Sequence, residues 1–361
     1  MEKISLPWDL VEEILSRVPS KSVTRFRSAS KQWNDLLVSN KFAKKHSANA
    51  PKESVIIMLI HSRVHLMRIN LDGIQDNVAP SVKVGAQLYL KDPLSSSSHQ
   101  VDIRKVCHCD GLLLCATKEN RLVIWNPCSG ETKWIQPRDS YKRTDFYALV
   151  SYKESDYYAL GYNNNSSCKK YKFLRVDRQD ISVNNEFEIY DVASDSWRKR
   201  RSWHISEENT YWIAQGWPDK FLLSFDFSTE KFQSLSLPHP FLYRVAALSL
   251  IREEQLCLLG ADHYHNVDTK SSDLHVWVAT STGPVMSRIK FLTVEDRPTL
   301  FSIGLSFLVD EQNNAVIFCN ENKHIRDEVR RGGNIRGSYC QFLLNYVPSL
   351  AQIQQGTLLK D

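Results

Sequence analysis

The order of hydrophobic and polar positions divides the 361-residue chain into two unequal parts near residue 50. In the first part, Leu6, Leu10 and Ile14 recur at a spacing of four, which places them on one face of an α-helix. Pro19 ends this helix, because a proline in a helix interior removes a hydrogen bond. The spacing therefore predicts an amphipathic first helix in a small helical head over residues 1–48.

Two shorter helices are expected to complete the head. Ser20 can cap the second helix, and Ser28 or Ser30 the third, by accepting hydrogen bonds from the backbone amides that follow. Phe26 and Trp33 are expected to fill the internal core. A core built from roughly forty residues is too small to cover the whole apolar face of the first helix. We therefore expect the head to bind a partner through that face.

Beyond residue 52 the hydrophobic positions form short runs rich in β-branched and aromatic residues, separated by turn residues. In one of them Phe187 and Ile189 fall on one face, while Glu186 and Glu188 fall on the other. No run keeps a helical period, so this larger part is predicted to be all-β. The clearest runs are 55–60, 112–115, 122–125, 187–190, 211–214, 222–227, 274–278, 315–319 and 342–346.

A repeated turn favours one all-β architecture over the others. In each copy an apolar strand ends, a Ser or Thr follows three positions later, and then comes Gly, Asp or Glu; in three copies an aromatic residue opens the returning strand. The strands end at Asn126, Asp191, Asp226 and Ala279, with a weaker copy at Asn345. These positions are 65, 35, 53 and 66 residues apart, which suits the four-stranded blades of a β-propeller. A sandwich or two stacked sheets is the alternative, and the irregular spacing leaves the blade count open.

The formal net charge of +5 is concentrated in the head, where residues 1–50 hold nine Lys and Arg against five Asp and Glu. The rest of the chain has almost no excess positive charge, so a nucleic-acid partner is not expected. The longest apolar run, 55–60, is far shorter than the ~20 residues that span a membrane, and no signal-peptide pattern opens the sequence. We therefore expect the eight cysteines to be thiols in a protein of the nucleus, the cytoplasm or both.

Motifs for catalysis or cofactor binding are weak. The Cys-His-Cys segment 107–109, with Cys115, could hold zinc, but no second ligand pair has the required spacing, so ordinary thiols are favoured. His263 and His265 lack a third ligand. The G-x-S-x-G, P-loop and G-x-G-x-x-G patterns are absent. We therefore expect no catalytic residue, no metal and no cofactor.

One strongly basic run, Arg198-Lys199-Arg200-Arg201, lies between Trp197 and Trp203. It could be a nuclear import signal, or it could contact nucleic acid or an acidic substrate. The favoured interpretation is a charged edge strand that discourages pairing with other chains. The same interpretation applies to a second cluster, which comprises Arg326, Arg330, Arg331 and Arg336.

The helical head resembles an F-box. Residues 6–37, LPWDLVEEILSRVPSKSVTRFRSASKQWNDLL, follow the family pattern LP-x-DL, EIL-x-R-[LV]-P, KS-[LV]-x-RF and K-x-W in order and spacing. The matching residues are Leu6, Pro7, Asp9, Leu10, Glu13, Ile14, Leu15, Arg17, Pro19, Lys21, Ser22, Arg25, Phe26, Lys31 and Trp33. One departure is the Ser-Ala-Ser at 28–30, where plant members usually have Cys-Val-Cys.

The remainder of the chain resembles the plant F-box-associated, kelch-like region. The stretches FEIYDVASDSWR, FLLSFDF and the terminal YVPSL are characteristic of it, although the Gly-Gly pairs of ordinary kelch repeats are absent from the repeat positions. The resemblance implies an α+β multidomain protein. Its expected parts are a three-helix F-box at 1–48, a large all-β domain, a kelch-like β-propeller, at 49–355, and a tail at 356–361.

The resemblance also implies a function. Such a chain is a non-catalytic substrate-recognition subunit of a Skp–cullin–F-box E3 ubiquitin ligase: the head binds the Skp adaptor and through it the cullin, and the β domain binds a protein target. The expected adaptor contacts are Leu6, Pro7, Leu10, Ile14, Leu15, Pro19 and Val23. Two other classes stay open. One is a propeller scaffold that acts outside any ligase, and the weaker one is a propeller that binds or hydrolyses carbohydrate.

Overall fold

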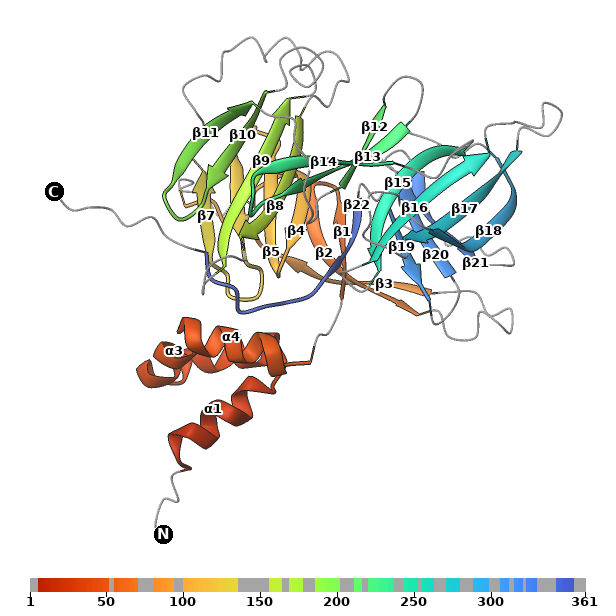
Figure 1. Cartoon of the computed structure of the whole chain (residues 1–361). Helices are drawn as coiled ribbons and strands as arrows, with labels where there is room; N and C mark the ends of the chain where they lie inside the picture. Colours follow the sequence, from red (N-terminus) through yellow and green to blue (C-terminus); the bar gives the residue numbers. More distant parts are fainter. Residues whose placement is uncertain are drawn as a thin grey trace. The chain divides into compact units, whose positions relative to one another are not determined.

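The computed structural model describes residues 6–51, 55–70, 81–93, 100–135, 156–163, 169–177, 186–201, 211–215, 220–236, 243–251, 255–262, 271–279, 288–298, 306–311, 315–320, 323–329 and 342–353. The helical head, residues 6–51, contains α1 (Trp8–Ser16), α2 (Ser20–Val23), the 3-10 helix η1 (Thr24–Ser28), α3 (Lys31–Leu37) and α4 (Asn40–Asn49). Figure 1 labels α1, α3 and α4. The expectation of three helices was therefore wrong in number, because it omitted α4.

Serine hydroxyls begin two of these helices. Ser30 and Ser39 precede α3 and α4, and each accepts a hydrogen bond of 3.2 Å from the backbone amide three residues later. The expected cap at Ser20 was wrong, because Ser20 is the first residue of α2 and its side chain makes no cap. Its hydroxyl instead donates a hydrogen bond of 2.9 Å to the backbone oxygen of Pro348, near the other end of the chain.

The second part of the chain, the β domain, is built from strands. Their bounds are β1 (Val55–Ile60), β2 (Arg63–Asn70), β3 (Ser81–Leu88), β4 (Ile103–Cys109), β5 (Leu112–Thr117), β6 (Leu122–Trp125), β7 (Thr132–Ile135), β8 (Asp156–Asn163), β9 (Lys170–Asp177), β10 (Glu186–Asp191), β11 (Ser196–Arg201), β12 (Tyr211–Gln215), β13 (Lys220–Asp226), β14 (Lys231–Ser236), β15 (Tyr243–Ile251), β16 (Gln255–Asp262), β17 (Ser271–Ala279), β18 (Arg288–Pro298), β19 (Ser306–Asp310), β20 (Ala315–Asn320), β21 (Lys323–Val329) and β22 (Phe342–Tyr346).

The strands form sheets of three or four members, and consecutive strands pair antiparallel. The orders are β4-β5-β6-β7, β11-β10-β9-β8, β12-β13-β14, β15-β16-β17-β18, β19-β20-β21 and β22-β1-β2-β3, so the last strand completes the sheet of the first three. First strands of successive sheets contact each other, as β4 does β8 and β15 does β19. Short meanders that meet through their first strands are the blades of a β-propeller. The predicted fold class, a helical head followed by a propeller, is thereby confirmed.

The repeated turn has the local chemistry that the sequence predicts. The side-chain Oδ1 of Asn126, Asp191 and Asp226 accepts a hydrogen bond from the backbone amide two residues later, at 2.8, 3.0 and 2.7 Å. Four positions after these residues the backbone turns left-handed, with φ of 76°, 53° and 57° at Gly130, Asp195 and Glu230. Each turn therefore closes on its own side chain.

Aromatic residues then pack across two of the hairpins, as expected. Tyr190 lies opposite Trp197 with ring centroids 5.2 Å apart, and Phe225 lies opposite Phe232 at 4.9 Å. The turn after Ala279 lies outside the described residues. The weaker copy at Asn345 was wrongly assigned: no returning strand follows β22 within the described residues 347–353.

The chain comprises two compact units. The first holds Met1–Val55, Tyr89–Arg201 and Tyr346–Asp361, and the second holds Ile56–Leu88 and Ser202–Asn345. The β-sheet core of the first unit comprises Leu112, Leu114, Ala116, Leu122, Ile124, Ile135, Tyr158, Leu160, Tyr171, Phe173, Tyr190, Val192 and Ile353. A core cluster of the second comprises Met58, Ile60, Met67, Leu308, Ala315 and Ile317.

Across the described residues, no helix combines the length and the apolar character that crossing a membrane would require. Several sequence-based expectations lie outside the described part of the chain. They concern His263, His265, Trp203, Arg330, Arg331, Arg336 and the tail at 356–361.

Candidate functional site

The first helix of the head presents an apolar stripe to solvent. Leu10 and Ile14 of α1 are 50% and 53% exposed, and Leu6, which precedes the helix, is 53% exposed. Pro7, at the N-cap of α1, is exposed as well. Four of the predicted adaptor contacts are therefore exposed at and before the start of α1 and along it, and we call this set of residues the α1 face.

The other predicted contacts lie deeper. Leu15 and Val23 are buried in the internal core of the head, and Pro19, the N-cap of α2, is half-buried. Leu15 lies one residue beyond Ile14, and a step of about 100° around the helix turns it from the solvent side to the core. The core comprises Leu15, Val23, Leu37, Phe42 and Leu350. We therefore correct the predicted set: Leu15 and Val23 support the α1 face from beneath and do not belong to its surface.

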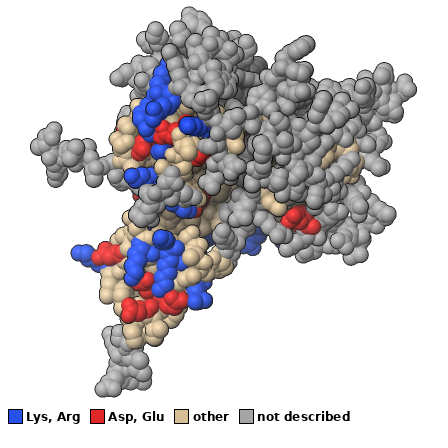
Figure 2. All heavy atoms as spheres, in the orientation of Figure 1, with Lys and Arg blue, Asp and Glu red and all other residues tan. Residues whose placement is uncertain are grey.

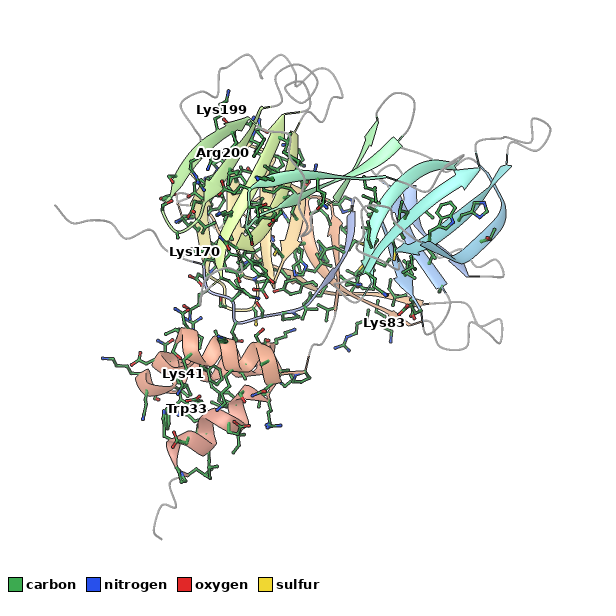
Figure 3. The ribbon with its side chains drawn as sticks, in the orientation of Figure 1. Trp33, Lys41, Lys83, Lys170, Lys199 and Arg200 are labelled. Carbon is green, nitrogen blue, oxygen red and sulfur yellow. The ribbon has the colours of Figure 1, made fainter. Side chains whose placement is uncertain are left out.

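Aromatic rings form a second exposed apolar group on the head. Trp8 stands edge-on to Trp33 with centroids 6.1 Å apart, and Phe26 lies 5.3 Å from the same ring. Phe26 is 40% exposed and Trp8 37%, so the expectation that Phe26 fills the core was wrong. Trp8 was not among the predicted contacts, because it occupies the unspecified position of the LP-x-DL pattern. Figure 3 labels Trp33 on the helical head.

A surface pocket opens beside this aromatic group. Its polar rim carries both signs of charge, and Figure 2 shows acidic and basic side chains together on the surface of the head. The pocket joins α1 to α3 and α4, and its lining residues are Trp8, Glu12, Lys31, Gln32, Asp35, Leu36, Ser39 and Lys41. Trp8 and Glu12 lie on a different side of α1 from Leu10 and Ile14, so the pocket is a separate feature of the head.

Ion pairs hold α4 against the back of α1. Lys45 lies 3.3 Å from a Glu12 oxygen and 3.0 Å from a Glu13 oxygen. Hydrogen bonds from Arg17 and then Lys45 lower the pKa of the Glu13 carboxyl, and the bond to Glu13 raises the pKa of Lys45. These groups are solvated, so the pairs orient the helix more than they stabilise it.

A buried histidine makes a second link between these helices. His46 of α4 is 2% exposed, and its Nε2 lies 2.7 Å from the backbone oxygen of Val18. The carbonyl oxygen can only accept, so Nε2 carries the hydrogen and donates it. Burial lowers the pKa of His46, against the effect of that hydrogen bond, which raises it. The imidazole is therefore neutral at pH 7.

In the described part of the chain, no group of three or more His, Cys, Asp or Glu side chains is arranged to hold a metal ion. In the 107–109 segment, the His108 ring accepts a hydrogen bond of 3.1 Å from the Gly111 amide, and burial lowers its pKa to about 4. Burial raises the pKa of the Cys107 thiol. Both side chains thus have the properties of packed, uncharged groups.

The basic run lies on β11, the edge strand of its sheet, as the favoured interpretation requires. Lys199 and Arg200, labelled in Figure 3, are exposed. Arg198 approaches Asp191 at 3.9 Å, and Lys199 lies opposite Glu188 in the register. Charged side chains on an edge strand discourage pairing with another chain.

Comparisons with known proteins agree with this arrangement of parts. The F-box domain family matches residues 4–45, and the F-box associated beta propeller domain family matches residues 55–353. The putative F-box protein At3g23260 of Arabidopsis thaliana is 52% identical over an alignment of 387 positions, which covers 98% of this chain and 100% of that protein. The putative F-box protein At3g21120 of the same plant is 44% identical, over 97% and 99%. The putative F-box/kelch-repeat protein At3g22730, also of Arabidopsis, is 38% identical, over 99% and 98%.

The family matches cover both structural parts: α1 to α3 and the first part of α4 fall within the F-box match, and the strands fall within the propeller match. The chain therefore belongs to the family of F-box proteins that carry an F-box associated β-propeller domain.

Proposed function

We propose that this chain is the substrate-recognition subunit of a Skp–cullin–F-box E3 ubiquitin ligase. The F-box binds the Skp adaptor, which connects the chain to the cullin, and the propeller binds a protein target. Ubiquitin transfer is performed by other subunits, so the chain itself is not catalytic. The complex acts in the nucleus, the cytoplasm or both.

The observation that carries the proposal is the α1 face. Leu10 and Ile14 of α1, and Leu6 just before it, are about half exposed on a domain that has few residues with which to cover them. Burying apolar surface contributes about 25 cal/mol per Å², so a partner that covers this face gains affinity. The F-box match supports the Skp adaptor as that partner, because F-box domains in general bind it.

Reconstitution tests the proposal. The purified full chain is mixed with a Skp adaptor, a cullin and its RING subunit, and the mixture is resolved by size-exclusion chromatography. We expect one peak that contains all four proteins in equal amounts. Elution of the chain apart from an adaptor that does bind a second F-box protein would contradict the proposal and favour the scaffold alternative.

A further inference from the structure

The last described segment of the chain, residues 348–353, contacts the helical head with one set of its groups. We call this segment the C-terminal strap. Leu350 is 8% exposed and belongs to the hydrophobic core of the head. The backbone oxygen of Pro348 accepts the hydrogen bond of Ser20, and the Gln352 side chain donates to the backbone oxygen of Val38. Every second residue of the strap therefore contacts the head.

The residues between them contact the β4–β7 sheet. Ser349 Oγ donates a hydrogen bond of 2.6 Å to the backbone oxygen of Asp110, in the β4–β5 turn. Ala351 packs against the β-sheet core, and Ile353, 2% exposed, is part of it. A two-residue alternation is the property of an extended chain, whose side chains point in opposite directions. In Figure 1 this segment follows β22 toward the C-terminus.

Two residues of the sheet are adapted to the strap. Asn126 is fully buried, and its amide nitrogen donates to the backbone oxygens of Ser349 and Ala351 at 3.2 and 2.7 Å. Without the strap this buried amide would lose both acceptors, which is costly. Gly111 has φ of +77°, and a Cβ there would lie 2.2 Å from Ser349 Oγ and 2.8 Å from its backbone nitrogen. Only glycine permits both the turn and this approach.

The head and the sheet also meet directly, at a native cysteine. Cys128, in the β6–β7 turn, lies close to Thr24 of η1 and to the charges of Lys21 and Arg27. Burial raises the pKa of the Cys128 thiol to about 11, despite the opposing effect of these three groups. The half-buried thiol would become more accessible if the head moved away, so its reactivity reports on that contact.

We propose that the C-terminal strap is a positioning element, which fixes the F-box on the β4–β7 sheet so that the adaptor-binding α1 face and the target-binding domain keep one relative orientation. The role of the strap in ubiquitin transfer rests on the proposed function, whereas its contacts with the head and the sheet do not. Holding two reactants in a fixed arrangement increases the rate of a transfer between them. A fixed head would restrict which lysines come within reach of the ubiquitin-charged enzyme.

The first test uses the full chain without any partner. The rate of N-ethylmaleimide addition is followed by mass spectrometry at Cys128 and at Cys115, which is buried within β5. In Leu350→Asp we expect Cys128 to react at least tenfold faster than in the wild type, with Cys115 still unreactive. The matched control is Leu6→Asp, the same substitution at an exposed leucine of the same head, which should leave Cys128 shielded.

Unchanged reactivity of Cys128 in Leu350→Asp would overturn the proposal. If Cys115 also becomes reactive in Leu350→Asp, the milder variant Leu350→Ala is tested instead, and Cys128 alone is again expected to react faster. Exposure of both thiols in both variants would also overturn it, because the strap would then stabilise the whole unit and not the placement of the head. None of these outcomes depends on adaptor binding, so they stay separate from the proposed function.

A second test addresses the purpose of the strap. In the reconstituted ligase, the lysines of the chain that receive ubiquitin are mapped for the wild type and for Leu350→Ala. We expect adaptor affinity to stay within threefold, because the α1 face is intact, while the modified lysines increase in number. An identical set of modified lysines at equal adaptor occupancy would contradict the positioning role.

Discussion

Truncating the α1 face should abolish most of the adaptor affinity without unfolding the head. The variant is Leu6→Ala/Leu10→Ala/Ile14→Ala, which removes three side chains that are each about half exposed. Their exposure means that the folded head gains little from them, and alanine is the best helix former. We therefore expect the thermal midpoint of the full chain to change little.

The expected loss of affinity follows from the exposed fractions. Complete burial of a Leu or Ile side chain contributes about 1.5–3 kcal/mol, so covering the exposed half of each contributes about 1 kcal/mol. Three such side chains together contribute about 3–4 kcal/mol. Since 1.4 kcal/mol corresponds to a factor of ten, the dissociation constant should rise by roughly a hundredfold to a thousandfold.

Biolayer interferometry with immobilised Skp adaptor measures this change on the full chain. The matched control replaces three other exposed hydrophobic residues, Val38→Ala/Val84→Ala/Tyr89→Ala, whose exposed fractions are 36%, 48% and 67%. We expect the control to bind like the wild type. A folded α1-face variant that binds within threefold of the wild type would refute the assignment of this surface.

Three further predictions concern stability. Burial lowers the pKa of His46 below 6.5 and the pKa of His108 from 6.5 to about 4. Below pH 6.5 the unfolded chain therefore binds more protons than the folded chain, so the free energy of unfolding should be highest above that pH and fall toward pH 4. Equal thermal midpoints at pH 7.5 and pH 5 would contradict this. Gly111→Ala and Gly130→Ala introduce the same backbone strain, at φ of +77° and +76°, but only the new Cβ at position 111 would clash with Ser349. In urea unfolding, Gly111→Ala should therefore lower the free energy of unfolding by about 1–3 kcal/mol more than Gly130→Ala does. Equal losses would contradict the close approach of Ser349 to Gly111. Asp226→Ala should lower the unfolding free energy by about 1–3 kcal/mol through the loss of its two turn hydrogen bonds, whereas an unchanged urea midpoint would show that the turn does not need them.

Local chemistry explains what could be predicted from the sequence. The repeated turns depend on residues within four positions of each other, such as Asp191 and Asp195, so the pattern of a single segment determined their structure. The spacing of Leu10 and Ile14 likewise predicted two apolar positions on one side of the first helix, and both are exposed. These features require no knowledge of distant contacts.

The features that the sequence did not predict depend on distant contacts or weak patterns. Helix α4 buries only Phe42 and His46, too few apolar positions to give a strong periodic signal. The sequence of the strap resembles a weaker copy of the repeated turn, because Pro348 and Ser349 are typical turn residues. Its actual conformation is set by partners more than two hundred positions away, among them Asp110 and Ser20. Tertiary contacts of this kind override local preference.

Co-purification from plant cells tests the central claim most directly. A tagged full chain and its Leu6→Ala/Leu10→Ala/Ile14→Ala variant are expressed at equal levels, captured, and probed for the Skp adaptor and the cullin. A substrate receptor predicts that both proteins accompany the wild type and that both are lost from the variant. Capture of the wild type without adaptor or cullin, or equal capture of both by the two chains, would contradict it.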